Sequence, residues 1–267
     1  MHTSVHWYVY YSNGKRYTVT SDMSLFIPVY MHTPPVYTTS KKPQNSISTM
    51  RFLLVFIMAF GSLDLLKGFP MALPKLVLLD RDGVINRDVG APGVVSISQF
   101  VLTKHAAEAI GTLKRHGCTV VLVTNQSCVG KGIINRAQLD EIHDYMVHKL
   151  LKEDDDARLD RLYICTSTSK EDTRYKPNPG MILEALEDFQ IDAADCVLIG
   201  DTLTDLQAAV ALPLRILVAT GYGTGIMGRG ATEEPECVVT SSSLPESILP
   251  FYYVQDLAAA VDYLVKR

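Results

Sequence analysis

The chain has 267 residues, 47% of them hydrophobic, which suffices for one large domain or two small ones with a substantial core. Its 25 basic and 29 acidic residues give a net charge of -4, so overall charge does not favour nucleic acid or an anionic membrane as partner. The five cysteines contain no CxxC pair, which argues against a disulfide framework and a self-contained zinc site, and favours a reducing compartment such as the cytoplasm.

Residues 1–70 differ in composition from the rest of the chain. Up to about Met50 they are rich in Tyr, Ser, Thr, Pro and His without periodicity, which predicts a poorly ordered extension. The uncharged run from Leu53 to Leu63 is shorter than the roughly 18 residues that a membrane-spanning helix needs, so no membrane partner is expected. We expect translation to begin at Met71 or Met50; a cleaved targeting segment is the alternative.

From Met71 onward, short apolar runs alternate with amphipathic stretches, which is typical of a parallel sheet with crossover helices. The predicted strands are Lys75–Leu79, Thr119–Val123, Arg161–Cys165, Cys196–Ile199 and Leu214–Val218. The predicted helices are His105–His116, Arg136–Lys152, Pro179–Gln190, Thr202–Ala211 and Val254–Val265. Because the strands are continuously apolar, both sheet faces should be covered, so residues 71–267 are expected to form a Rossmann-like three-layer α/β/α domain.

Four polar segments follow the predicted strands, at the edge where ligands gather in an open parallel sheet. They are Asp80-Arg81-Asp82-Gly83-Val84-Ile85-Asn86, Thr124-Asn125-Gln126, Tyr175-Lys176-Pro177-Asn178-Pro179-Gly180-Met181 and Gly200-Asp201-Thr202-Leu203-Thr204-Asp205. Taken singly, each is more often a surface turn, a helix cap or an exposed lysine. Their occurrence in this order favours a site in which closely spaced carboxylates share a cation and polar groups bind an anion.

Together, the four segments resemble the motifs of the haloacid dehalogenase superfamily of phosphohydrolases, over roughly residues 74–225. They are most similar to the heptose-bisphosphate and histidinol-phosphate phosphatases. The resemblance implies a haloacid dehalogenase-type fold with a minimal cap, Mg²⁺ as cofactor, and hydrolysis of a phosphomonoester on a small metabolite. The implied substrates are a sugar bisphosphate such as D-glycero-D-manno-heptose 1,7-bisphosphate, or histidinol phosphate.

The resemblance also implies a role for each matching residue. Asp80 would be the nucleophile that forms an aspartyl-phosphate, and Asp82 the general acid and then base. Mg²⁺ would be held by Asp80, the backbone carbonyl of Asp82, and Asp201. The implied phosphate-binding residues are Thr124, Asn125 and Lys176, with Asp205 supporting the metal carboxylate or the lysine.

The sequence departs from these phosphatases after the third strand. Between Ile164 and Tyr175, where they commonly hold a structural zinc, it has one cysteine and no histidine, so no zinc is expected. Tyr175 stands where the family usually has an arginine, with Arg174 one place earlier. The further side chains that could contact a substrate are Arg81, Asn86 and Arg174.

Two alternatives remain at this stage, and the oligomeric state is not predicted. The only insertion near the first motif is Asn86–Gln99, so the site is expected to be open to a bulky substrate. This is compatible with a polynucleotide 3′-phosphatase, whose Thr-Asn-Gln and Lys-Pro-x-x-Gly-Met segments are similar to those of this chain. The net negative charge argues against that function. The second alternative is a catalytically inactive binding protein of the same fold. The presence of all four motif residues argues against this alternative; they are Asp80, Asp82, Lys176 and Asp201.

Overall fold

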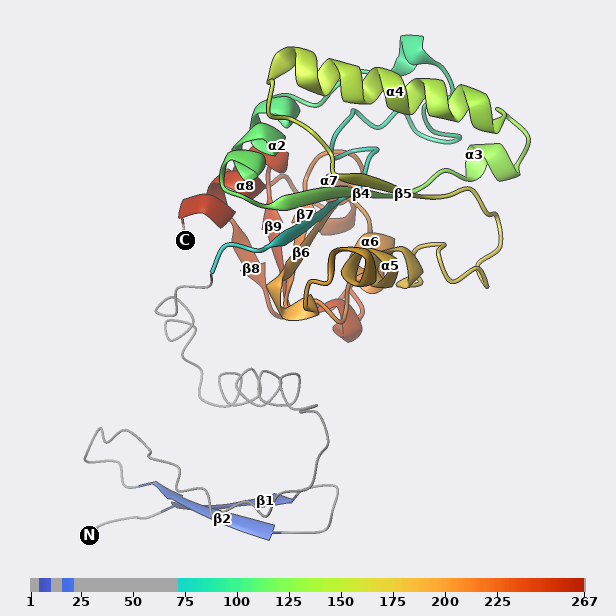
Figure 1. Cartoon of the computed structure of the whole chain (residues 1–267). Coiled ribbons are helices and arrows are strands. Elements are labelled where there is room, and N and C mark those ends of the chain that lie inside the picture. The colour runs from blue at the N-terminus through green and yellow to red at the C-terminus, as the bar shows by residue number, and fades with distance from the viewer. Residues whose placement is uncertain (1–4, 11–15, 22–71, 267) are drawn as a thin grey trace. The chain divides into compact units, whose positions relative to one another are not determined.

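A computed structural model of the chain describes residues 5–10, 16–21 and 72–266 (Figure 1). The chain divides into two compact units, Met1–Leu63 and Asp64–Arg267. In the first, strands β1 (Val5–Tyr10) and β2 (Arg16–Ser21) form an antiparallel pair, where the sequence composition predicted poorly ordered chain. The apolar run from Leu53 and both candidate start residues lie outside the described residues, so the expected boundary at residue 71 stays a prediction.

The second unit is built on a seven-stranded sheet. Its strands are β3 (Leu76–Leu79), β4 (Thr119–Asn125), β5 (Arg161–Cys165), β6 (Cys196–Gly200), β7 (Leu214–Val218), β8 (Glu236–Val238) and β9 (Phe251–Val254). Their order is β5-β4-β3-β6-β7-β9-β8, and every neighbouring pair is parallel except β8 with β9. All five predicted strands are confirmed, and β8 and β9 are additional.

Helices cover both faces of this sheet (Figure 1). Helices α2 (Ala106–Arg115), α4 (Arg136–Glu153) and α8 (Leu257–Lys266) lie on one face. Helices α5 (Gly180–Phe189) and α6 (Leu203–Ala208) lie on the other. The short helices α3 (Ser127–Gly130) and α7 (Gly223–Met227) follow strands β4 and β7. The prediction of a three-layer α/β/α fold is therefore confirmed. The predicted start of the last helix at Val254 was wrong, because that residue ends β9.

The central strand β3 shows why its sequence is uniformly apolar. All four of its side chains are fully buried. Val77 and Leu79 pack into the cluster that contains residues of α2, α4 and α8, whereas Leu76 and Leu78 pack into the cluster beneath α5. Burying one such side chain contributes roughly 1.5–3 kcal/mol, so β3 is anchored from both layers. The residue that follows it, Asp80, is thereby held at a fixed point on the sheet edge.

The segment that connects β3 to α2 contains a single regular element in the described chain, the 3-10 turn Ile97–Gln99. No folded cap domain is therefore inserted at this point, as the sequence predicted. The helices of the described ranges include none with the length and hydropathy needed to cross a bilayer.

Candidate active site

The predicted site residues meet at the carboxyl edge of the sheet. A pocket of about 150 Å³ opens there and is lined by Asp80, Asp82, Asp88, Thr124, Asn125, Lys176, Asp201, Thr202 and Tyr222. A larger cavity of about 310 Å³ lies at the start of α5, lined by Lys170, Glu171, Thr173, Asn178, Pro179, Gly180 and Leu183. That larger cavity contains none of the predicted site residues, so its size does not make it the candidate site.

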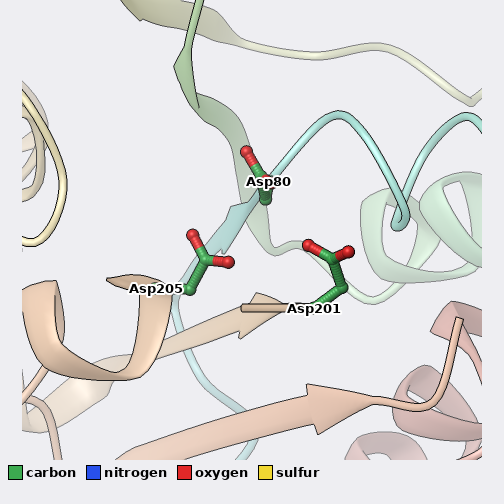
Figure 2. A group of neighbouring side chains, drawn as sticks. All are labelled: Asp80, Asp201 and Asp205. Carbon is green, nitrogen blue, oxygen red and sulfur yellow. The ribbon is translucent and has the colours of Figure 1, made fainter. Parts of the chain in front are cut away.

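Three buried carboxyl groups form the centre of the site (Figure 2). Asp80 follows β3, Asp201 follows β6, and Asp205 lies on α6; one oxygen from each lies within 4.8 Å of the others. Burial, together with the neighbouring carboxylates, raises the pKa of Asp80 to about 6 and that of Asp201 to about 9. These groups therefore resist carrying their negative charges together unless a cation compensates them.

Lys176 supplies part of that compensation. Its buried ammonium donates to Asp80 Oδ1 at 2.7 Å, to Asp205 Oδ1 at 2.6 Å and to the carbonyl of Val123 at 2.8 Å. Burial opposes the charge of Lys176, but Asp205 and Asp80 raise its pKa above the usual value. All three N–H donors are used, which fixes the ammonium in one place.

Asp205 is occupied on both oxygens. While Oδ1 accepts from the lysine, Oδ2 accepts from the backbone N–H of Thr202 at 3.0 Å and from its hydroxyl at 2.5 Å. The same pair forms the capping box that starts α6. Asp205 therefore contacts the lysine directly, and its supporting role stays a prediction.

Asp201, in contrast, keeps an oxygen available. Its Oδ2 accepts from the backbone N–H of Tyr222 at 2.9 Å, whereas its Oδ1 is buried without a hydrogen-bond partner. A buried carboxylate oxygen without a partner is costly, and hard oxygen donors are the ligands that Mg²⁺ prefers. Asp80 and Asp201 thus fit a divalent cation.

The backbone packs closely around Asp201 on one side of the pocket. A Cβ atom at Gly221, where φ is +60°, would lie 2.0 Å from Asp201 Oδ2. A Cβ atom at Gly83, where φ is +80°, would lie 2.2 Å from the same oxygen. Only glycine allows both segments to approach the carboxylate this closely.

Asp82 is held by three donors. The Nη2 group of Arg81 donates to both of its oxygens at 3.0 and 2.9 Å, Asn86 donates to Oδ1 at 2.9 Å, and Gln126 donates to Oδ2 at 2.9 Å. Burial favours the neutral acid, but Arg81, Asn86 and Gln126 outweigh it and lower the pKa of Asp82. The carboxylate has a fixed orientation and still lines the pocket, with 21% of its side chain exposed.

The two residues at the end of β4 also line the pocket. The side-chain amide of Asn125 pairs with the backbone of Lys176 in both directions, each hydrogen bond being 3.0 Å long. The hydroxyl of Thr124 accepts from Gln126 at 3.0 Å, which leaves its own proton for another acceptor. Asn125 therefore positions the lysine segment, besides bordering the pocket.

The three arginine and asparagine side chains suggested as substrate contacts lie elsewhere. Arg81 is fully buried, and Asn86 is fully buried as well; both reach the pocket only through Asp82. Arg174 pairs with Glu184 of α5 at 3.0 Å and does not line the pocket. The structure thus brings together every predicted catalytic, phosphate-binding and metal residue, but not these three.

Three residues at or behind the pocket lie outside the four polar segments, and a fourth, Gln126, was given no role of its own although it belongs to the Thr124-Asn125-Gln126 segment. Gln126 donates to Asp82, and Tyr222, next to the Gly221 turn, donates to Asp201. Asp88, half-buried, adds an acid to the pocket lining. His143 of α4 bonds to Arg81, and no local sequence signal marked it.

Comparison with known proteins supports the same resemblance. A family model described as haloacid dehalogenase-like hydrolase matches residues 61–212. The chain is 33% identical to the D-glycero-beta-D-manno-heptose-1,7-bisphosphate 7-phosphatase of Neisseria meningitidis serogroup A over 189 residues, which cover 69% of this chain and 97% of that protein. It is 38% identical to the enzyme of the same name from Escherichia coli K12 over 155 residues, which cover 54% and 79%.

A solved structure is similar as well. The D,D-heptose 1,7-bisphosphate phosphatase of B. bronchiseptica, in complex with magnesium and phosphate, superposes with a TM-score of 0.61 at 32% identity and covers 72% of this chain and 98% of that one. The match therefore extends over nearly the whole length of that protein.

Proposed function

Because the chain belongs to the haloacid dehalogenase-like hydrolase family and is a phosphatase, we propose that it hydrolyses phosphomonoesters through an aspartyl-phosphate on Asp80, with Mg²⁺ as cofactor. The observation that carries the proposal is the arrangement of Asp80 between a buried lysine and Asp201. This arrangement supports the proposal because it brings the proposed nucleophile, a fixed cation and the proposed metal ligand Asp201 to one pocket.

The cofactor would be held by Asp80, Asp201 and the backbone carbonyl of Asp82. Bound there, Mg²⁺ would neutralise negative charge on the ester and let an anionic nucleophile approach it. The unpartnered Oδ1 of Asp201 supports this assignment, and so does the B. bronchiseptica structure, which is a complex with magnesium and phosphate.

The reaction runs in two half-reactions. In the first, an oxygen of Asp80 attacks phosphorus, the bond from phosphorus to the leaving oxygen breaks, and Asp82 gives its proton to that oxygen. In the second, water attacks the aspartyl-phosphate, Asp82 takes the water proton, and inorganic phosphate leaves with Asp80 restored. Lys176, Thr124 and Asn125 would bind the phosphoryl oxygens, where charge is spread in the transition state.

Asp82 must be ionised to act as the base and protonated to act as the acid, and its environment in the free protein favours the ionised form. Its lowered pKa keeps it ionised in the free protein, ready to act as the base of the second half-reaction. For the first, it must hold a proton, and the arrival of a negatively charged ester favours that form because like charges raise the pKa of a carboxyl group.

For the substrate we propose a small phosphorylated metabolite: a sugar bisphosphate such as D-glycero-D-manno-heptose 1,7-bisphosphate, or histidinol phosphate. The names of the relatives support the first, and a pocket of about 150 Å³ is suited to a phosphoryl group with a small attached body. We propose a cytoplasmic location, because the five cysteines contain no CxxC pair, which argues against a disulfide framework and favours a reducing compartment.

The deciding experiment measures phosphate release from p-nitrophenyl phosphate with and without Mg²⁺. The wild type and the surface control Asp140→Asn should both be active with Mg²⁺, whereas Asp80→Asn should be inactive. After acid quenching, mass spectrometry should find a phosphorylated peptide that contains Asp80. Equal inertness of all three proteins would instead favour an inactive binding protein.

A substrate panel then defines specificity. It contains phosphosugars with one and two phosphates, histidinol phosphate, nucleotides and a 3′-phosphorylated oligonucleotide. Preferential release from the oligonucleotide, steeply reduced by salt, would contradict the small-metabolite proposal and favour a polynucleotide 3′-phosphatase.

A further inference from the structure

A buried polar chain leads from α4 to the candidate acid. His143 lies on the buried face of this helix, among Leu139, Ile142 and Met146, and is only 3% exposed. Its Nε2 atom is 3.1 Å from Nη1 of Arg81, a residue 62 positions away in the sequence. A polar ring in an otherwise apolar helix face needs an explanation beyond packing.

The chemistry of the two side chains determines which atom donates this hydrogen bond. Arginine is always charged and has only donors, so Nη1 donates and His143 Nε2 accepts. The ring must then be neutral with its proton on Nδ1. Burial and the Arg81 charge, which lower the pKa of His143 to about 4, agree with a neutral ring at neutral pH.

Arg81 in turn has one ionic partner within hydrogen-bond reach in the described chain. It is fully buried, and its Nη2 group donates to both oxygens of Asp82. The guanidinium is planar and rigid, so fixing Nη1 on the histidine also fixes where Nη2 points. Besides Asn86 and Gln126, a residue of α4 that does not line the pocket therefore contributes to the orientation of the Asp82 carboxylate.

We propose that His143 is a positioning residue for catalysis, which acts through Arg81 to keep the Asp82 carboxyl aimed at the leaving oxygen of the phosphoester. This inference rests on the proposed function, in which Asp82 is the general acid. His143 touches neither substrate nor metal in this scheme; it accepts one hydrogen bond and thereby holds the guanidinium.

The leaving group of the substrate provides the test. p-Nitrophenolate leaves readily without a proton, whereas the alkoxide of a phosphosugar needs one from the acid. Loss of acid positioning should therefore lower kcat/KM for a phosphosugar more than for p-nitrophenyl phosphate. A change that only loosens the fold should lower both values by the same factor.

Three variants at matched positions separate these outcomes. In His143→Leu, which lacks the acceptor, we expect kcat/KM for the phosphosugar to fall about ten-fold more than for p-nitrophenyl phosphate, a part of the 10²–10⁴ that a general acid contributes. In His143→Gln, whose side-chain oxygen can accept from Arg81, the ratio should return close to the wild-type value. Met146→Leu, one turn along the same buried face, should leave the ratio unchanged.

Asp82→Asn serves as the reference. If it shows the leaving-group effect and His143→Leu does not, the positioning inference is overturned and the proposed function stands. If Asp82→Asn shows no such effect, the acid role fails and the inference falls with it. Should His143→Leu not fold, Arg81→Lys must show the same effect, because an ammonium cannot contact both partners as the planar guanidinium does.

Discussion

Magnesium should stabilise the folded chain, and Asp201 should be required for that stabilisation. A ligand present at 100 times its Kd adds about 2.7 kcal/mol to the free energy of unfolding. For a unit of this size, 1 kcal/mol raises Tm by roughly 2–4 °C, so saturating Mg²⁺ should raise the Tm of the wild type by about 5–11 °C.

The Asp201→Asn variant should behave differently in the two conditions. Because the pKa of Asp201 is about 9 without metal, its side chain is protonated at pH 7, and an amide of the same shape replaces it at a cost of less than about 1 kcal/mol. With Mg²⁺ the Tm of the wild type should rise, whereas the Tm of the variant, which lacks a metal-binding charge, should rise little.

Differential scanning fluorimetry at pH 7, with Mg²⁺ or with EDTA, measures both effects. Asp140→Asn is the control, since the side chain of Asp140 on α4 is 48% exposed and pairs with Arg136; this variant should keep the full rise in Tm. An undiminished shift in Asp201→Asn, or none in the wild type, would refute the assignment of the metal to this carboxylate.

Three further results are expected. Lys176→Met leaves two buried carboxylates without their cation, so it should lower the free energy of unfolding in urea by about 3–5 kcal/mol and abolish activity; an unchanged midpoint would contradict the buried pairing. Because the fold holds the pKa of His143 at about 4, below the 6.5 of the unfolded chain, unfolded chains bind more protons between these values, and stability should be lost as pH falls from 6.5 to 4. The contribution is at most about 3 kcal/mol, and urea titrations should show a smaller loss in His143→Gln than in the wild type. Gly221→Ala should abolish the rise in Tm that Mg²⁺ causes, since its Cβ would collide with Asp201. The control Gly117→Ala has φ of +82° and no atom within 4 Å of its Cβ, so it should lower the stability of the fold without changing the rise in Tm with Mg²⁺.

The sequence predicted those parts of the fold whose residues reveal their surroundings locally. Strands β5 and β7 match their predicted bounds because four of the five residues in each are apolar, which marks a strand locally. Strand β8 has three residues, one of them the exposed Glu236, and exists because β9 offers it hydrogen bonds. Strand β9 has four residues and runs almost directly into α8, so its pattern merged with that of the helix. Pairing between distant short segments leaves little local signal.

The candidate site divides in the same way. The acids and Lys176 were predictable, because parallel strands bring the residues that follow them to one edge. Their hydrogen-bond partners were not: that Asn125 pairs with the backbone of Lys176 depends on how two loops 51 residues apart meet. The role of His143 depends in the same way on the packing of α4 against the sheet, which no spacing within the helix encodes.

Metal affinity and metal-free instability have one origin in this site. Lys176 balances one negative charge, while Asp80, Asp205 and Asp201 could supply three. Without a divalent cation the remaining charge is relieved by protons, as the raised pKa values of Asp80 and Asp201 indicate. Each proton bound there is one that Mg²⁺ must displace, so the ion should bind more tightly as pH rises toward 9. It follows that a neutral side chain at either position needs no proton to relieve this repulsion and, because it lacks the negative charge, weakens the binding of the ion.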